Sequence, residues 1–176
     1  MTTTMNLQSN DFELFAVPER FAQDRAALDA RWKDLQREAH PDKFSVHGPA
    51  AQRVAMQWSV RINEAYQRLK NPVERAAYLC ELRGVKIDAE RNTAMPAAFL
   101  MQQIELREAL EEATTQEDLD RISLQANQNM REQLLKTEQY LDVDSNTPEA
   151  AQAVRALMFI ERFSQEIDAR YELLGQ

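Results

Sequence analysis

The chain has 176 residues, 44% of them hydrophobic, and its 21 Lys/Arg against 29 Asp/Glu give a formal net charge of −8. This length is enough for one or two domains with a hydrophobic core. The acidic balance, without a basic stripe interleaved with aromatic residues, argues against nucleic acid as the main ligand, and the single cysteine excludes both an intramolecular disulfide framework and a multi-cysteine metal site.

The pattern of the chain predicts an all-α protein. Its three glycines fall where helical patterns end, and no alternating apolar run predicts a convincing sheet. No apolar segment approaches membrane-spanning length, and residues 1–9 are expected to be a short disordered extension rather than a targeting peptide. We therefore expect a soluble, cytoplasmic protein that does not contact a membrane.

Residues 10–75 make up the first predicted unit, with 11 Lys/Arg and 10 Asp/Glu. Asn10 and Asp11 are typical caps for a short helix that ends before Pro18, and Asp24 opens a helix to about residue 39. The buried stripe expected on this second helix consists of Leu28, Trp32, Leu35 and Ala39. Because proline disfavours helical geometry in the residue before it, the helix should end at His40.

The loop "HPDKFSVHG" comes next, and a long helix is predicted from about residue 49 to 69. The residues that this helix is expected to bury are Ala51, Val54, Trp58, Ile62, Ala65 and Leu69. Asn71 then caps another helix that has Pro72 at its first position and Gly84 as its terminator. We assign residues 76–95 to this connecting helix and a polar linker.

Residues 96–176 make up a second helical unit, and the chain from residue 76 onward carries 10 Lys/Arg and 19 Asp/Glu. One helix starts at Pro96, and the last is predicted to open with a Thr147 cap followed by Pro148. The middle helix repeats an apolar period through Leu119, Ile122, Ala126, Met130 and Tyr140. Three long helices with short polar links predict an antiparallel three-helix bundle. The linker contains Val85 and Ile87, which we expect to pack the first unit against the bundle. We therefore expect an L-shaped arrangement of the two units.

The tripeptide His40-Pro41-Asp42 admits three hypotheses. His40 could be a general base oriented by Asp42, in a small helical hydrolase. His40, Asp42 and His47 could bind a metal ion, although their spacing is not diagnostic. The tripeptide could also be a simple turn, in which Pro41 stops one helix and Asp42 bonds to the backbone. The chain has no glycine-rich phosphate loop, and the tripeptide alone does not choose among the three.

The context of the tripeptide resembles a J-domain, the module that activates the ATPase of DnaK-class chaperones. The resemblance covers about residues 10–75, from "FELFAVP" through a helix with basic residues expected to be exposed, then the tripeptide, to "INEAYQRLKNP". It implies that the chain is not an enzyme and that the chaperone hydrolyses the ATP. It also implies a chaperone-binding surface formed by His40, Pro41, Asp42, Lys43, Arg31, Lys33 and Arg37.

The stretch "AAFLMQQIELREALEEA" predicts a second surface. On a helix, Phe99, Leu106, Leu110 and Ala113 fall on one narrow face, which is the expected core stripe. The apolar Leu100, Met101 and Ile104 lie elsewhere, among Glu105, Glu108 and Glu112. Leu100, Met101 and Ile104 either pack against the J-domain or a neighbouring helix, or form the apolar centre of a docking surface rimmed by the three glutamates.

Taken together, "DFELF", "LQREAHPDKF", "INEAYQRLKNPVERAAYL", "FLMQQIELREAL" and "VRALMFIERF" resemble the HscB family of J-type co-chaperones in iron–sulfur cluster assembly. The resemblance implies binding to an IscU-type scaffold, targeting of that scaffold to an HscA-type chaperone, and stimulation of the chaperone's ATP hydrolysis. The scaffold-binding residues that it implies are Leu100, Met101, Ile104, Glu105, Glu108 and Glu112, with Phe159 from the last helix.

The chain departs from the family pattern in ways that bear on these expectations. It lacks the N-terminal CxxC pairs of some eukaryotic members, and no residue resembles an iron–sulfur ligand, so we expect no cofactor or metal ion on this chain and any cluster to stay on the scaffold. Ala16 stands where a J-domain often has glycine, a change expected to matter little, and Phe159 lies at the margin of a core stripe. The alternative is a general J-domain adaptor that presents another client to a DnaK-class chaperone.

Overall fold

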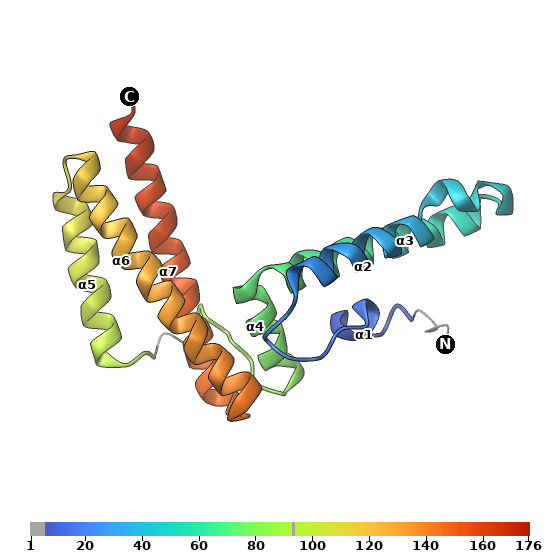
Figure 1. Cartoon of the computed structure of the whole chain (residues 1–176), viewed down its shortest axis with the longest axis horizontal. Helices are drawn as coiled ribbons and strands as arrows, with labels where there is room; N and C mark the ends of the chain where they lie inside the picture. Colours follow the sequence, from blue (N-terminus) through green and yellow to red (C-terminus); the bar gives the residue numbers. More distant parts are fainter. Residues whose placement is uncertain (1–5, 93) are drawn as a thin grey trace. The chain divides into compact units, whose positions relative to one another are not determined.

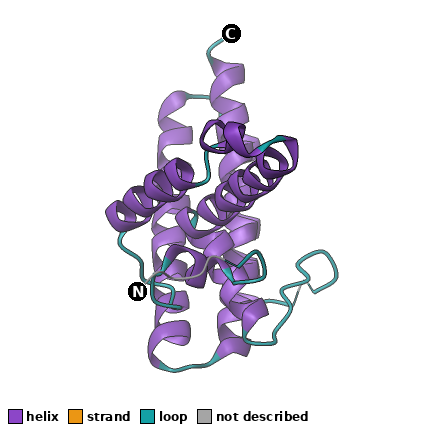
Figure 2. Cartoon of the chain, turned by 90° about the vertical axis from the view of Figure 1, so that its right-hand side faces the viewer, coloured by secondary structure: helices purple, strands orange, loops and turns teal. Residues whose placement is uncertain are grey.

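The computed structural model describes residues 6–92 and 94–176, and helices are the only regular structure in these ranges (Figure 2). The predicted all-α class is therefore confirmed. The contacts divide the chain into two compact units, residues 1–79 and 80–176. Residues 1–5 of the expected disordered extension lie outside the described ranges, whereas residues 6–9 form a turn in which Ser9 N–H donates to the Asn6 carbonyl (3.0 Å).

The first unit is a long helical hairpin with a short helix packed on it (Figure 1). Its elements are α1 (Asp11–Phe15), α2 (Arg25–Glu38), the 3₁₀ helix η1 (Pro41–His47), α3 (Pro49–Lys70) and the start of α4 (Pro72–Leu82). The α2 and α3 helices run side by side, and η1 links them at one end of the hairpin. The side chains most fully buried in this unit include Phe12, Phe15, Leu28, Leu35, Ile62 and Leu69.

Local capping residues set most helix ends in this unit as the sequence predicts. The Asn10 side chain accepts from Glu13 N–H (2.8 Å), and Asp24 accepts from Ala26 N–H (3.0 Å). Asn71 likewise accepts from Val73 N–H (2.9 Å) at the start of α4. These side chains satisfy amide groups that a helix leaves unpaired in its first turn.

Ala16 ends α1 in the left-handed backbone region, with φ 52° and ψ 41°. Glycine adopts this conformation without the steric penalty that a Cβ atom brings. The glycine often found here in J-domains therefore has a conformational cause, and Ala16 carries local backbone strain.

Asp11 is buried at the centre of the contacts that hold α1 on the hairpin. Its carboxylate lies 2.8 Å from Arg61 Nη1 and 2.6 Å from Arg68 Nε, both on α3. Its backbone N–H donates to the Tyr78 hydroxyl (3.0 Å), and the Tyr78 ring stacks on Phe12 with centroids 5.8 Å apart. One residue thus connects α1 with α3 and α4 within the first unit.

The second unit contains three long helices, which confirms the predicted bundle of helices in the C-terminal half (Figure 1). They are α5 (Ala97–Glu112), α6 (Gln116–Glu138), which continues into the π-helical turn η2 (Gln139–Val143), and α7 (Thr147–Leu174). One core cluster consists of Leu110, Ala113, Leu119, Ile122, Ala126, Phe163 and Ile167, and a second of Phe99, Ala156 and Ile160.

Two local predictions are wrong. Val54 is exposed, and the next residue, Ala55, about 100° further around the helix, takes the buried position on α3. The cap of α7 is Asn146, whose side chain accepts from Glu149 N–H (3.4 Å), while Thr147 is already helical. Asparagine is at least as good a cap as threonine, so the earlier of two adjacent caps is used.

Candidate functional site

The first candidate surface is the turn that contains His40-Pro41-Asp42. His40 follows the end of α2 with extended backbone angles (φ −62°, ψ 128°), and the chain then enters η1. Three hydrogen bonds hold the turn: Asp42 N–H to His40 Nδ1 (3.3 Å), Lys43 N–H to the His40 carbonyl (3.0 Å), and Ser45 Oγ to the Asp42 carbonyl (3.0 Å). The turn is therefore held by its own backbone and side chains.

The capping group of this turn is the His40 ring. Because Nδ1 accepts a hydrogen bond, the neutral imidazole carries its hydrogen on Nε2, which leaves that nitrogen as a donor to a partner. The turn hypothesis placed the backbone bond on Asp42, and this detail is wrong. Instead, the Asp42 carboxylate is exposed and lies 3.6 Å from His40 Nδ1.

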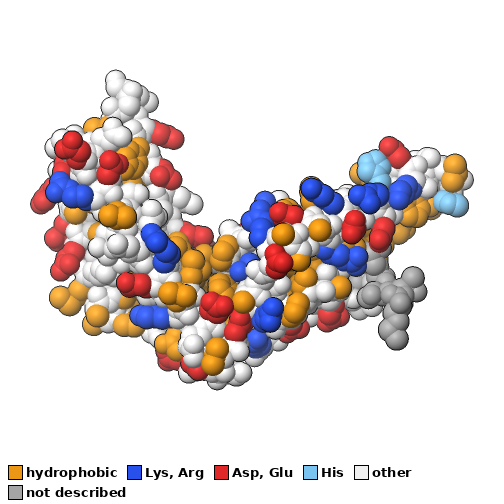
Figure 3. All heavy atoms as spheres, viewed as in Figure 1, with side chains coloured by type: hydrophobic (Ala, Val, Ile, Leu, Met, Phe, Trp, Pro, Cys, Tyr) orange, Lys and Arg blue, Asp and Glu red, His pale blue; other side chains and the backbone are white. Residues whose placement is uncertain are grey.

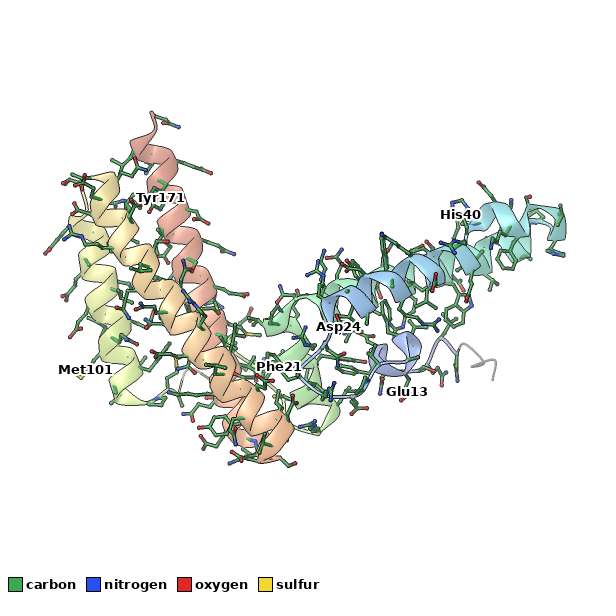
Figure 4. All side chains as sticks on the ribbon, in the orientation of Figure 1. Glu13, Phe21, Asp24, His40, Met101 and Tyr171 are labelled. Atoms are coloured by element: carbon green, nitrogen blue, oxygen red, sulfur yellow. The ribbon has the colours of Figure 1, made fainter. Side chains whose placement is uncertain are left out.

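The described residues hold no group of three or more His, Cys, Asp or Glu side chains placed to bind a metal ion. His47, the third ligand of the metal hypothesis, has its ring centroid 6.4 Å from that of Phe44. Both His40 and Asp42 project into solvent at the end of the hairpin, where Figure 4 labels His40. Such a turn is suited to contact another molecule rather than to enclose a substrate.

Basic side chains accompany this turn along α2 (Figure 3). Lys33 and Arg37 are exposed, and Arg37 makes a loose ion pair with Asp34 (3.7 Å). Lys43 is exposed in η1. Charges in this setting are screened by water and salt, so they act on the encounter with an acidic partner more than on stability.

The expectation that Arg31 is exposed is wrong. Arg31 is half-buried, and its Nη2 donates to the Leu14 carbonyl of α1 (3.5 Å). Its position explains this, because Arg31 lies three residues after Leu28 and four before Leu35, the two buried leucines of α2. The side chain therefore takes part in the packing of α1 on α2.

The second candidate surface lies on α5, where the exposures agree with the division made by the helical wheel. Phe99, Leu110 and Ala113 are buried, whereas the docking patch, by which we mean Leu100, Met101, Ile104, Glu105, Glu108 and Glu112, is exposed throughout. In Figure 4, Met101 projects away from α6 and α7. The three apolar residues leave part of their area open to water, which is the usual property of a protein-binding surface.

The carboxylates of the docking patch carry unbalanced charge. Among the described residues, Glu105, Glu108 and Glu112 make no ion pair. Acidic side chains also crowd the outer side of α5 in Figure 3. An apolar centre with a negative rim favours a partner that has apolar side chains surrounded by lysine or arginine.

Phe159 occupies an intermediate position between core and surface. It is half-buried on α7, with its ring edge-on to Phe99 (centroids 6.2 Å apart). Arg107 on α5 lies over the same ring, with its Cζ 5.3 Å from the centroid, and Arg107 Nη1 donates to Glu166 (3.0 and 3.1 Å). The sequence reasoning missed Arg107, although its place between the core stripe and the docking patch marks it as a residue at the seam between helices.

Comparisons with known proteins find similarity to HscB co-chaperones over nearly the whole chain. Residues 95–168 match the family described as the HSCB C-terminal oligomerisation domain. The chain is 47% identical to a co-chaperone protein HscB homolog of Burkholderia thailandensis, over 97% of this chain and 98% of the relative, and 46% identical to the homolog of Burkholderia multivorans, over the same shares.

Solved structures agree with these relatives. The chaperone HscB from Vibrio cholerae is 32% identical and superposes with a TM-score of 0.82, covering 94% of this chain and 99% of that one. Human co-chaperone HscB superposes with a TM-score of 0.89 over 95% of this chain and 84% of that one, at 24% identity, which supports the fold. No helix in the described ranges is long and apolar enough to cross a membrane.

Proposed function

Because the chain belongs to the HscB family of co-chaperones, we propose that it binds an IscU-type iron–sulfur scaffold, delivers it to an HscA-type, DnaK-class chaperone, and stimulates that chaperone's ATP hydrolysis. The consequence is transfer of the cluster and maturation of iron–sulfur proteins in the cytoplasm. The two units divide the work, since the first contacts the chaperone and the second contacts the scaffold.

The turn at His40-Pro41-Asp42 is the proposed trigger. Lys33, Arg37 and Lys43 accelerate the encounter with an acidic face of the chaperone by long-range attraction. At contact, the exposed Asp42 carboxylate pairs with a cation of the chaperone and the His40 ring donates from Nε2. The chain supplies no catalytic group of its own, and the ATP is hydrolysed in the partner.

The docking patch on α5 is the proposed scaffold site. Leu100, Met101 and Ile104 bury their exposed area against apolar residues of the scaffold, and the three glutamates pair with its basic rim. The cluster is cargo held by the scaffold. Two patches of the same negative sign repel one another, so the rim also favours the scaffold over a second copy of this chain.

The proposal rests mainly on one observation: the His40-Pro41-Asp42 turn is exposed and held by its own hydrogen bonds. The chain that contains it is 47% identical to an HscB homolog over nearly its full length. The test is the steady-state ATPase rate of an HscA-type chaperone with its scaffold, with and without this protein. We expect stimulation by the wild type and its loss with Asp42→Asn, since the amide retains the shape but not the charge of the carboxylate.

Asp168→Asn is the matched control, because Asp168 is an exposed carboxylate on α7, in the other unit. Stimulation that survives Asp42→Asn would refute the role of the turn. The general J-domain adaptor is distinguished by client: it predicts stimulation of a DnaK-class ATPase without binding to an IscU-type scaffold. Turnover of a substrate without any chaperone would instead favour the hydrolase hypothesis.

A further inference from the structure

A glutamine next to the docking patch has an amide that nothing in the described residues satisfies. Gln103 on α5 is only 2% exposed, and neither its Nε2 nor its Oε1 has a hydrogen-bond partner there. A primary amide offers two donor hydrogens and an accepting oxygen, and buried groups of this kind are nearly always bonded in folded proteins. The neighbouring Gln102 follows this rule, since its Nε2 donates to Asn129 Oδ1 (3.3 Å).

The contacts of Phe159 place its ring over the turn of Gln103. Phe99 and Arg107 lie four residues before and four residues after Gln103, so the three share one side of α5 at steps of about 40°. Their backbones are about 12 Å apart at 1.5 Å per residue. The Phe159 ring contacts both side chains, at 6.2 Å from the Phe99 ring and 5.3 Å from Arg107 Cζ, so it lies between the Phe99 ring and the Arg107 guanidinium on this side of α5.

Gln103 also borders the docking patch directly. Leu100 lies three residues before it and is its neighbour on the helix surface, whereas Ile104, the next residue, lies about 100° further around the helix. From the contacts of Phe159 with Phe99 and Arg107, we infer that this half-buried ring covers the Gln103 amide from the α7 side.

We propose that Gln103 is a latent scaffold contact: docking displaces the Phe159 ring and uncovers the Gln103 amide, which then hydrogen-bonds to the backbone of the scaffold beside its apolar residues. The inference rests on the proposed function, because it deepens the assignment of the same patch. A glutamine amide can donate to a backbone carbonyl and accept from a backbone N–H at the same time. It can therefore bind an exposed peptide group of the scaffold whatever side chain that residue carries. The contact adds geometric specificity to a patch that is otherwise apolar and ionic.

The Phe159 ring is suited to this movement. It is held by an edge-on aromatic contact and by a cation–π contact, and it is not fully enclosed. Arg107 has a further partner in Glu166 (3.0 Å), and this contact does not involve the Phe159 ring. The unsatisfied amide makes the closed arrangement costly, which lowers the free energy needed to open it.

The test compares Gln103→Met with the matched control Gln102→Met in the full-length protein. Methionine has nearly the shape of glutamine without the amide. We expect Gln103→Met to raise the melting temperature of the free protein and to weaken binding of an IscU-type scaffold about tenfold in calorimetry, which is about 1.4 kcal/mol. Gln102→Met should leave scaffold affinity unchanged, because its amide is already bonded on the α6 side.

A higher melting temperature together with weaker scaffold binding distinguishes the proposed contact from a purely structural role of Gln103. Unchanged scaffold affinity in Gln103→Met, or a fall in its melting temperature, would overturn the inference while leaving the proposed function intact. Wild-type protein that fails to bind the scaffold would overturn the proposed function, and the inference with it.

A second measurement does not depend on the variant. Side-chain amide resonances of Gln103, followed by NMR in the ¹⁵N-labelled wild type, should shift and gain protection from hydrogen exchange when the scaffold is added. Resonances that stay unchanged in the saturated complex would refute the contact.

Discussion

Removing the apolar centre of the docking patch tests the proposed scaffold site most directly. The perturbation is the triple variant Leu100→Ala, Met101→Ala and Ile104→Ala. All three side chains are exposed on α5 and none is among the buried core residues, so the fold and the thermal stability of the protein should change little.

The structure sets the size of the expected effect. The exposed fractions of Leu100, Met101 and Ile104 are 38%, 63% and 56%, which is the area of about one and a half whole side chains. Fully burying such a side chain is worth about 1.5–3 kcal/mol. Alanine retains the Cβ atom, so we expect a loss of about 2–3 kcal/mol, or roughly 30- to 150-fold in Kd.

The assay is isothermal titration of an IscU-type scaffold into the wild type, the triple variant and a control with Leu124→Ala and Leu135→Ala. Leu124 and Leu135 are exposed by 57% and 67% but lie on α6, outside the docking patch. The control should bind like the wild type. Equal losses in both variants, or none in the triple variant, would show that exposure on α5 does not identify the scaffold site.

Further predictions concern the first unit and the single thiol. Asp11→Asn should destabilise the protein by about 2–3 kcal/mol and lower the melting temperature by about 10 °C, because it removes the charge from a buried carboxylate paired with two arginines; a change below about 3 °C would contradict this. Ala16→Gly should raise the melting temperature by a few degrees, because it removes the strain of a positive φ, and a decrease would argue against that strain. Replacing Lys33 and Arg37 with alanine should slow chaperone association at low salt and have little effect at about 0.5 M NaCl, which stopped-flow mixing would measure; an equal effect at both salts would exclude steering. Burial raises the pKa of the Cys80 thiol to about 11, so only about one thiol in a thousand is ionised at pH 8, and Ellman's reagent should react only after unfolding; rapid labelling of the folded protein would contradict this burial.

The features that the sequence predicted correctly depend on neighbours within one or two helical turns. Asn10, Asp24 and Asn71 cap helices at the expected places, and Pro41 ends α2 at the turn before η1. The separation of Phe99 from Met101 on α5 follows from the angle between successive residues alone. Capping and helical periodicity act locally, so a single chain can reveal them without knowledge of what packs on what.

The features that the sequence missed depend on which helix lies opposite. Arginine is usually exposed, and the sequence gives no sign that Arg31 is an exception. In the structure, Arg31 packs against α1 and donates a hydrogen bond to the Leu14 carbonyl. The burial of Asp11 likewise required two arginines from α3, more than forty residues further along the chain. Contacts of this range leave no periodic trace in the sequence.

By itself, the sequence determined the helical class, the position of the His40-Pro41-Asp42 turn and the exposed face of α5, because each follows from backbone geometry over a few residues. Only the tertiary structure decided that α1 half-buries Arg31 and that the buried amide of Gln103 has no hydrogen-bond partner among the described residues. Whether a polar group is satisfied depends on atoms brought from distant parts of the chain, and only the packed molecule shows which atoms those are.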